Sequence, residues 1–167
     1  MRPVTSTKTS PSETALFGAG CFWGVEETFR VLPGVLETAV GYSGGITVNP
    51  NYEAVCTDQT GHAEVVQVTF DPSVISYEKL LGVFFDNHNP TTPNQQGPDF
   101  GSQYRSVILV NSLLQRKAAQ DAKETLGKSG KWRQPIVTQI EDAAPFYPVE
   151  EYHQKYLMKR GLDSCHI

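Results

Sequence analysis

The stretch TALFGAGCFWGVEETFRV, residues 14–31, contains the strongest folding signal of this sequence. Its first half, from Thr14 to about Phe22, is a run of apolar and small residues typical of a buried strand. Its second half, Trp23 to Val31, consists largely of residues compatible with a helix, and Pro33-Gly34 stops that helix. The pattern predicts a strand that turns directly into a helix, with Cys21 at the turn.

The rest of the chain alternates strand and helix signals, and its long connection at 87–104 contains prolines and glycines but hardly any apolar residue. Further strands are predicted at Val35–Tyr42, Val65–Phe70, Ser106–Val110 and Ile136–Ile140, and helices at Tyr77–Asp86 (capped by Ser76), Leu113–Leu126 and Val149–Arg160. This order predicts an α+β protein, a ferredoxin-like α/β sandwich. We expect a mixed sheet, helices mainly on one face, extra elements and a long irregular C-terminal tail.

Length and charge narrow the class of protein. A chain of 167 residues fits one domain of ordinary size. The net charge of −4 lacks the basic excess of nucleic-acid or anionic-membrane binders, so neither partner is expected. No apolar run approaches the roughly 18 residues that cross a bilayer. The polar first residues lack the features of a secretory signal, and we expect a soluble cytoplasmic protein.

The three cysteines, Cys21, Cys56 and Cys165, are an odd number at distant spacings without any CxxC pair. That pattern argues against a disulfide scaffold or a cysteine-rich zinc site and favours a reducing compartment. Cys21 stands where the free N–H groups and dipole of a helix start stabilise a thiolate. The alternative is a small buried hydrophobic residue. Residues 18–24 also fail the dinucleotide fingerprint, because the third glycine comes one position late.

Two neighbouring features fit a reactive thiol. Phe22 and Trp23 are either core residues or an apolar wall beside the nucleophile. Glu64 stands where a loop meets the apolar strand that starts at Val65, so partial desolvation raises its pKa and lets it donate a proton near neutral pH. The alternative for Glu64 is a solvated surface charge. His62-Ala63-Glu64 has the H-x-E form of zinc deaminases, but no P-C-x-x-C follows, so no metal site is predicted.

Several motifs of the chain together resemble one family. They are GCFWG (20–24), followed by Glu26-Glu27, then GYSGG (41–45), YEAVC (52–56), TGHAE (60–64), NHNPT (87–91), GSQYRS (101–106) and EYHQKYL (151–157). In this order they resemble peptide methionine sulfoxide reductase A, and the resemblance covers about Leu16 to Leu157. Reduction of methionine sulfoxide in free methionine, peptides or oxidised proteins is a known repair reaction, with one enzyme for each sulfoxide epimer.

The resemblance implies a role for each matching residue. Cys21 is the nucleophile that attacks the sulfoxide sulfur, and Glu64 supplies the proton to the sulfoxide oxygen. Phe22 and Trp23 would hold the substrate methyl group. The family's two phenols that hydrogen-bond the oxygen match Tyr52 and Tyr104, and an acidic residue that orients the substrate matches Asp99. The implied reaction is specific for the S epimer and requires no cofactor.

The resetting half of the reaction involves a second thiol. Cys165 lies in the tail near the C-terminus, where the family commonly places resolving cysteines, and a flexible tail can reach a buried thiol. A disulfide between Cys165 and Cys21 would then be reduced by thioredoxin. Cys56 is interpreted as structural, and His62, His88 and His153 as hydrogen-bonding scaffold residues.

We therefore expect a monomer with a disordered leader at 1–13, a single catalytic domain at 14–160 and a flexible tail at 161–167 that carries Cys165. Two alternatives belong to other classes. Cys21 with one of the histidines could form an acyl-transfer hydrolase, which would not need Cys165. Phe22, Trp23, Tyr52 and Tyr104 could instead form an aromatic cage for methylated cations, which would tolerate loss of Cys21.

Overall fold

The computed structural model describes residues 12–20, 22–45, 61–96 and 99–148. The strands are β1 (Glu13–Ala19), β2 (Val35–Ser43), β3 (Ala63–Phe70), β4 (Gln95–Gln96), β5 (Asp99–Phe100), β6 (Ser106–Val110), β7 (Gln139–Asp142) and β8 (Tyr147–Pro148). The helices are α2 (Phe22–Arg30), α4 (Tyr77–Asp86) and α5 (Leu113–Lys128), with a 3₁₀ turn, η1, at Ser102–Tyr104. Within these residues, no helix has the length and apolar character needed to cross a membrane.

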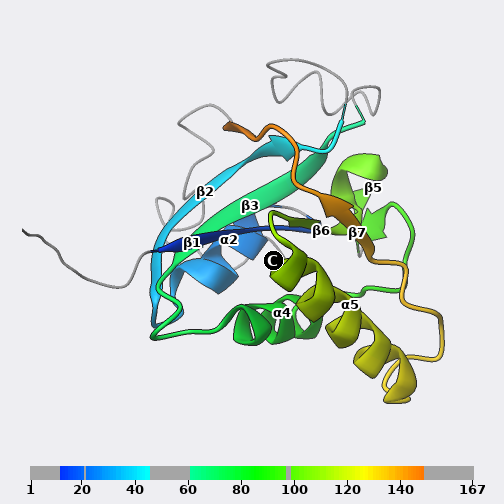
Figure 1. The fold of residues 1–167 in the computed structure, drawn as a ribbon. Helices are drawn as coiled ribbons and strands as arrows, with labels where there is room; N and C mark the ends of the chain where they lie inside the picture. The colour runs from blue at the N-terminus through cyan, green and yellow to red at the C-terminus, as the bar shows by residue number, and fades with distance from the viewer. Residues whose placement is uncertain (1–11, 21, 46–60, 97–98, 149–167) are drawn as a thin grey trace, which may run out of the picture.

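Six strands form one mixed sheet in the order β7-β6-β1-β3-β2-β8 (Figure 1). All its pairs are antiparallel except β6 with β7, which are parallel. The inner order β6-β1-β3-β2, with α2 between β1 and β2 and α4 between β3 and β6, is that of the split βαβ arrangement of ferredoxin-like folds. The predicted α+β class and mixed sheet are thus confirmed.

Both faces of β1 are buried, which explains why its sequence is apolar without alternation. Ala15, Phe17 and Ala19 belong to the main core, where Phe17 stacks on Phe29 of α2 with ring centroids 5.0 Å apart. The helices α2, α4 and α5 lie on this side of the sheet (Figure 1). Leu16 faces the other side, in a smaller apolar cluster.

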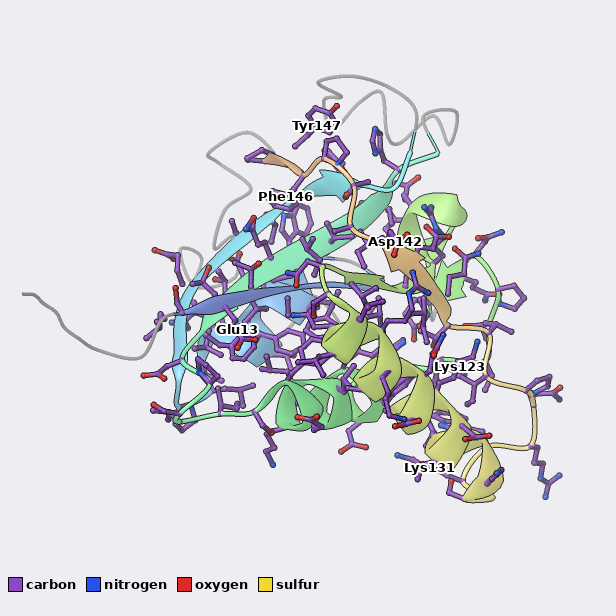
Figure 2. The ribbon with its side chains drawn as sticks, in the orientation of Figure 1. Glu13, Lys123, Lys131, Asp142, Phe146 and Tyr147 are labelled. Carbon is purple, nitrogen blue, oxygen red and sulfur yellow. The ribbon has the colours of Figure 1, made fainter. Side chains whose placement is uncertain are left out.

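No helix among the described residues covers the smaller cluster. Phe146, in the segment between β7 and β8, packs against it on the side away from α4 and α5 (Figure 2). This segment is also tied to β2, because the Ser43 hydroxyl donates a hydrogen bond of 2.9 Å to the carbonyl of Pro145. The helices therefore lie mainly on one face, as predicted.

Local signals fixed two elements at their predicted bounds. The helix Tyr77–Asp86 begins after Ser76, whose hydroxyl accepts the N–H of Lys79 at 3.0 Å. The strand Ser106–Val110 also has its predicted limits and is buried along its whole length. The strand pairs with β1 on one side and β7 on the other, so the apolar run Val107–Val110 suits this position.

Several predictions need correction. The first strand ends at Ala19 and not near Phe22, which opens α2, and the third strand begins at Ala63 and not at Val65. The strand placed at Ile136–Ile140 is β7, at Gln139–Asp142, because the parallel ladder with β6 begins at the pair Val107 and Gln139. The helix expected to end near Leu126 continues to Lys128, where the N–H of Ser129 caps the carbonyl of Leu126. The connection at 87–104 also contains the two-residue pair β4–β5 and η1. The predicted helix at Val149–Arg160 and the C-terminal tail lie outside the described residues.

Candidate active site

Two glycines shape the turn between β1 and α2. A Cβ atom on Gly18 would lie 2.7 Å from Cγ1 of Val107 and 3.2 Å from the carbonyl oxygen of Glu64, so β1 passes its neighbours too closely for a side chain there. Gly20 has a φ of +98°, a conformation that L side chains rarely adopt. Because α2 begins at Phe22, the predicted strand-to-helix turn is confirmed. Cys21 itself lies outside the described residues.

The helix that starts after Cys21 is fixed to the sheet by a buried carboxylate. Glu26 is 1% exposed, and its Oε2 accepts a hydrogen bond of 2.8 Å from the hydroxyl of Thr38 on β2. One turn earlier in α2, Trp23 packs against the main core. These contacts fix the direction of the helix axis relative to the sheet. The free N–H groups of its first turn therefore have a fixed direction, which is the arrangement that favours an anion at the helix start.

Glu64 is deeply buried beside this turn. It lies near the start of β3, opposite Tyr42 of β2, and is 2% exposed. Its backbone runs directly against Gly18, three residues before Cys21. Removal from water disfavours the charged form of a carboxyl group, so this environment suits a proton donor. The alternative of a solvated surface charge is wrong, because the side chain is not at the surface.

Tyr104 is a further predicted site residue whose side chain the structure describes at this end of the sheet. It is half-buried at the end of η1, which packs against β3, the strand that carries Glu64. Two residues later Ser106 pairs with Ala19 at the end of β1. Tyr104, Glu64 and the turn before Cys21 therefore lie at the same end of the sheet, although they are far apart in the sequence.

Arg105 lies at the same end of the sheet, and the sequence reasoning missed it. It is buried, and its Nη2 donates a hydrogen bond of 3.0 Å to the carbonyl of Gly61. A Cβ on Gly44 would lie 3.2 Å from the same Nη2 atom. The guanidinium thus joins the end of β2 and the start of β3 next to Tyr104. Only its place in the GSQYRS motif could have drawn attention to it.

The two described histidines are hydrogen-bonded within the scaffold. Nδ1 of His62 accepts the N–H of Gly45 at 3.0 Å, and the ring is 2% exposed. In His88, Nδ1 lies 2.6 Å from the carbonyl of Phe84 and Nε2 lies 2.7 Å from the hydroxyl of Ser106. Burial lowers the pKa of His88 to about 4, so the ring is neutral at physiological pH. Both ring nitrogens of His88 are engaged, so it does not fit the role of a hydrolase base.

The other predicted residues are placed only in part. Phe22 opens α2 and Asp99 opens β5, where it pairs with Gln96 of β4, and these are backbone positions. Tyr52, Cys56, His153 and Cys165 lie outside the described residues. Among the residues that are described, no group of three or more histidine, cysteine, aspartate or glutamate side chains could hold a metal ion.

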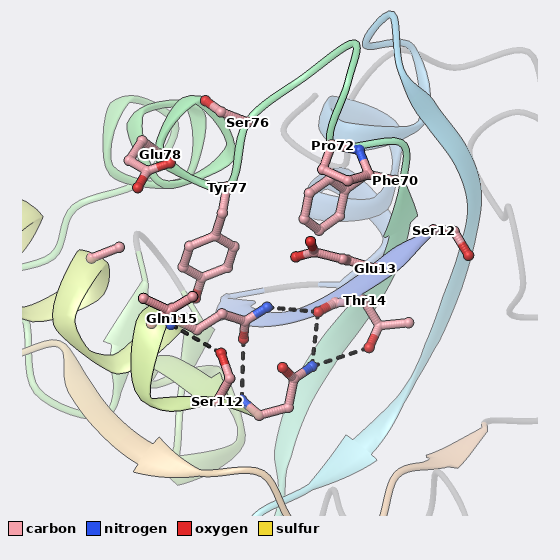
Figure 3. A pocket seen from close by; sticks show the side chains of 13 residues that line it. Ser12, Glu13, Thr14, Phe70, Pro72, Ser76, Tyr77, Glu78, Ser112 and Gln115 are labelled. Carbon is pink, nitrogen blue, oxygen red and sulfur yellow. Dashed lines mark hydrogen bonds between the residues drawn. The ribbon is translucent and has the colours of Figure 1, made fainter. Parts of the chain in front are cut away.

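A separate groove of about 700 Å³ lies between the starts of α4 and α5 (Figure 3). Glu13, Tyr77 and Gln115 are among the residues that line it, and Nε2 of Gln115 donates a hydrogen bond of 2.9 Å to the carbonyl of Thr14. Because this groove adjoins the first residues of β1, it lies at the opposite end of that strand from Gly20. It is not part of the candidate active site.

The fold and the site define a class of protein: a ferredoxin-like α+β domain with a cysteine just before a helix start and a buried carboxyl group beside that turn. The family model for peptide methionine sulfoxide reductase matches residues 13–167. The chain belongs to the peptide methionine sulfoxide reductase family and is an oxidoreductase. This membership sets aside the hydrolase and aromatic-cage alternatives.

Individual relatives agree with this assignment. The peptide methionine sulfoxide reductase MsrA of Methanoculleus marisnigri is 61% identical over 153 residues, which cover 92% of this chain and 93% of the relative. The crystal structure of Mxr1 from Saccharomyces cerevisiae in its reduced form is 38% identical with a TM-score of 0.83, covering 90% of this chain and 86% of Mxr1. Mxr1 in complex with Trx2 is 28% identical with a TM-score of 0.62, covering 87% of this chain and 84% of that one.

Proposed function

We propose that the chain reduces the S epimer of methionine sulfoxide, free or in peptides and oxidised proteins, to methionine, with Cys21 as the nucleophile. Family membership supports the class of substrate, and the buried carboxyl group of Glu64 beside the turn before Cys21 supports the chemistry. Sulfoxide reduction needs a soft nucleophile, an acid that protonates the leaving oxygen and an apolar place for the methyl group. The residues at this end of the sheet provide these three functions.

In the first step the Cys21 thiolate attacks the sulfoxide sulfur while Glu64 donates its proton to the sulfoxide oxygen. The attack forms a bond between the two sulfur atoms, and the protonated oxygen then passes to the sulfur of Cys21. As it does so, the methionine sulfur loses its bonds to that oxygen and to Cys21. Methionine sulfur is reduced by two electrons, and Cys21 is oxidised by two electrons to a sulfenic acid. A thiolate, a sulfoxide and one proton thus give a sulfenic acid and a thioether.

The neighbouring side chains orient the substrate. Phe22 and Trp23 hold the methyl group, since two aromatic rings give an apolar wall beside the nucleophile. Tyr52 and Tyr104 donate hydrogen bonds to the sulfoxide oxygen and stabilise the charge that develops on it. Asp99, at the start of β5, orients the rest of the substrate.

A second thiol resets the enzyme. Cys165 attacks the sulfenic acid of Cys21, which releases water and forms a disulfide between the two cysteines. The dithiol of thioredoxin then reduces this disulfide by thiol–disulfide exchange and becomes oxidised itself. The complex of the homologue Mxr1 with Trx2 supports a thioredoxin as the electron donor. A monomeric state and a cytoplasmic location remain predictions.

The test measures methionine release from each sulfoxide epimer in a single turnover and then with thioredoxin. We expect turnover of the S epimer alone. Glu64→Gln keeps a hydrogen-bond donor but cannot transfer a proton, so the first step should slow by roughly 10²- to 10⁴-fold, with Glu64→Asp between it and the wild type. The wild-type rate should also fall as pH rises through the pKa of Glu64, and this fall should be absent in Glu64→Gln.

Glu78→Gln is the matched control, because Glu78 is an exposed glutamate in the first turn of α4, and its rate should equal that of the wild type. A Glu64→Gln rate within a few-fold of the wild type, with the same decline at high pH, would assign the acid to Tyr52, Tyr104 or water. Equal turnover of both epimers would disprove the epimer assignment.

A further inference from the structure

Gln96 links the segment of Asn89 to the strand pair β4–β5. Its Oε1 accepts the backbone N–H of Asn89 at 2.7 Å, and its Nε2 donates to the carbonyl of the same residue at 2.8 Å. The carboxamide thus pairs with both backbone groups of one residue, as a neighbouring strand would. Gln96 also belongs to β4, whose partner β5 begins at Asp99. Because Gln96 is only 8% exposed, water does not readily replace these two hydrogen bonds.

The aliphatic part of the same side chain lies against Gly20. A Cβ atom built on Gly20 would be 2.7 Å from Cγ and 2.8 Å from Cβ of Gln96. Cβ atoms do not lie that close to other side-chain atoms in real proteins. The Gln96 side chain can therefore occupy this position only because Gly20 has no side chain. Gly20 directly precedes Cys21 in the sequence. The position of the Gln96 chain therefore limits how the turn before the nucleophile can move.

The segment that holds Gln96 is itself fixed from the other side. His88, next to Asn89, contacts the carbonyl of Phe84 in α4 and the hydroxyl of Ser106 in β6. The Ser106 hydroxyl lies 2.7 Å from that of Thr138. Since a carbonyl only accepts, Nδ1 of the neutral His88 ring carries the proton, and Nε2 accepts from Ser106. Asn89 is thus held in place by its neighbour and gives Gln96 a firm support.

We infer that Gln96 is a positioning residue for the nucleophile. Its side chain is held by the backbone of Asn89, packs against Gly20 and thereby fixes the turn before Cys21. This role rests on the proposed function of Cys21 and extends it. Gln96 transfers no proton and needs no contact with substrate. Its effect depends on one donor and one acceptor that face the backbone of Asn89, and this requirement makes the inference testable.

The variant Gln96→Glu tests the need for both groups. A protonated carboxyl group has one acceptor and one donor, like the carboxamide, whereas a carboxylate can only accept and would face the carbonyl oxygen of Asn89. Burial disfavours the carboxylate and raises the pKa of such a group above its usual value. The variant should therefore position the turn correctly in acid and lose this ability as pH rises.

The measured quantity is the single-turnover rate of the variant divided by that of the wild type, between pH 5 and pH 8. The titratable groups on the segments around Gln96 are Cys21, His88, Asp99 and Tyr104, and both proteins contain them, so the ratio removes their direct contribution. We expect a ratio within about threefold of one at pH 5 and a fall of roughly 10- to 100-fold by pH 8, the cost typical of a misplaced reacting group. Circular dichroism at each pH checks that the variant is folded.

Two further variants complete the test. Gln95→Glu puts the same charge on the neighbouring residue of β4 and should give a ratio that does not change with pH. Gln96→Ala removes both hydrogen bonds and should be impaired to a similar degree at every pH. A Gln96→Ala rate equal to that of the wild type, or a folded Gln96→Glu protein whose ratio is constant between pH 5 and pH 8, would overturn the inference.

Alkylation of Cys21 by iodoacetamide, mapped by peptide mass spectrometry, separates this inference from the proposed function. The alkylation rate of Gln96→Glu should equal that of the wild type at pH 5. At pH 8 the two rates should differ by at least about threefold, and by more than the rates of Gln95→Glu and the wild type differ. If the wild type released no methionine from either epimer, the proposed function would fail, while the alkylation rates would still test the role of Gln96. Equal alkylation rates in an active enzyme would reject the role of Gln96 alone.

Discussion

Protonation of His88 should make the stability of this protein depend on pH in the acid range. The ring lies between α4 and β6, and burial lowers its pKa from 6.5 to about 4, partly offset by the hydrogen bond to the carbonyl of Phe84. Between these two pH values the unfolded chain binds a proton at this residue that the folded protein does not bind. Stability contributed by the neutral ring is therefore fully present above pH 6.5 and decreases as pH falls.

The size of the effect follows from the two pKa values. A difference of one pKa unit corresponds to about 1.4 kcal/mol, so the free energy of unfolding should fall by about 1.4 kcal/mol per pH unit from this residue alone. From pH 6.5 to pH 4 the loss adds up to about 3 kcal/mol, a large fraction of the 5–15 kcal/mol typical of a domain.

The comparison protein is His88→Gln, which has no titrating ring and keeps one donor and one acceptor at this position. Urea unfolding of both proteins under reducing conditions, at intervals from pH 4 to pH 7.5, gives the free energy of unfolding of each. The variant should be less stable at pH 7. Between pH 6.5 and pH 4 its free energy of unfolding should depend less steeply on pH, by about 1.4 kcal/mol per pH unit, which corresponds to one proton. All other titrating groups are common to both proteins. Identical slopes would show that His88 titrates normally in the folded protein and would refute the reasoning.

Two other predictions concern the thiols and the glycines. Cys165→Ser should release about one methionine per enzyme and then stop, with Cys21 oxidised, whereas Cys56→Ser should cycle normally with thioredoxin; the opposite result would exchange the two roles. Gly18→Ala should lower the free energy of unfolding by about 1–3 kcal/mol in urea titrations, because its Cβ would collide with Val107. In contrast, Gly82→Ala should raise the free energy of unfolding by about 0.5–1 kcal/mol, since Gly82 is exposed within α4 and an added Cβ would meet no other atom. Equal effects of the two substitutions would contradict this reasoning.

The sequence by itself determined the elements whose signals are local. The helix Tyr77–Asp86 has its predicted limits because the cap at Ser76 and the spacing of Leu80, Leu81, Phe84 and Phe85 are properties of neighbouring residues. The turn between β1 and α2 followed in the same way from glycines beside an apolar run. The burial of Glu64 was also within reach, because a lone carboxyl group beside an apolar run indicates partial burial, although the strand β3 begins one residue earlier, at Ala63.

Tertiary structure decided the features that depend on pairing between distant segments. The strand β7 lies at Gln139–Asp142 and not at Ile136–Ile140, because its register against β6 sets where the ladder begins. Just before that ladder, the N–H of Val137 donates to the carbonyl of Pro90 at 2.8 Å. The sequence contains no local sign of this pairing, since each partner alone is compatible with several backbone conformations.

The positioning network around Gly20 is the clearest case. Gln96, an ordinary polar residue in a loop by composition, is buried against a residue 76 positions away, and His88 reaches a hydroxyl 18 positions away. Side-chain periodicity reports only which face of an element is apolar, so it cannot indicate which polar group will find a partner once that face is buried. The sequence therefore indicated the thiol and the carboxyl group that we propose as nucleophile and acid. Only the folded chain shows that the uncharged residue Gln96 packs against Gly20, next to that thiol in the sequence.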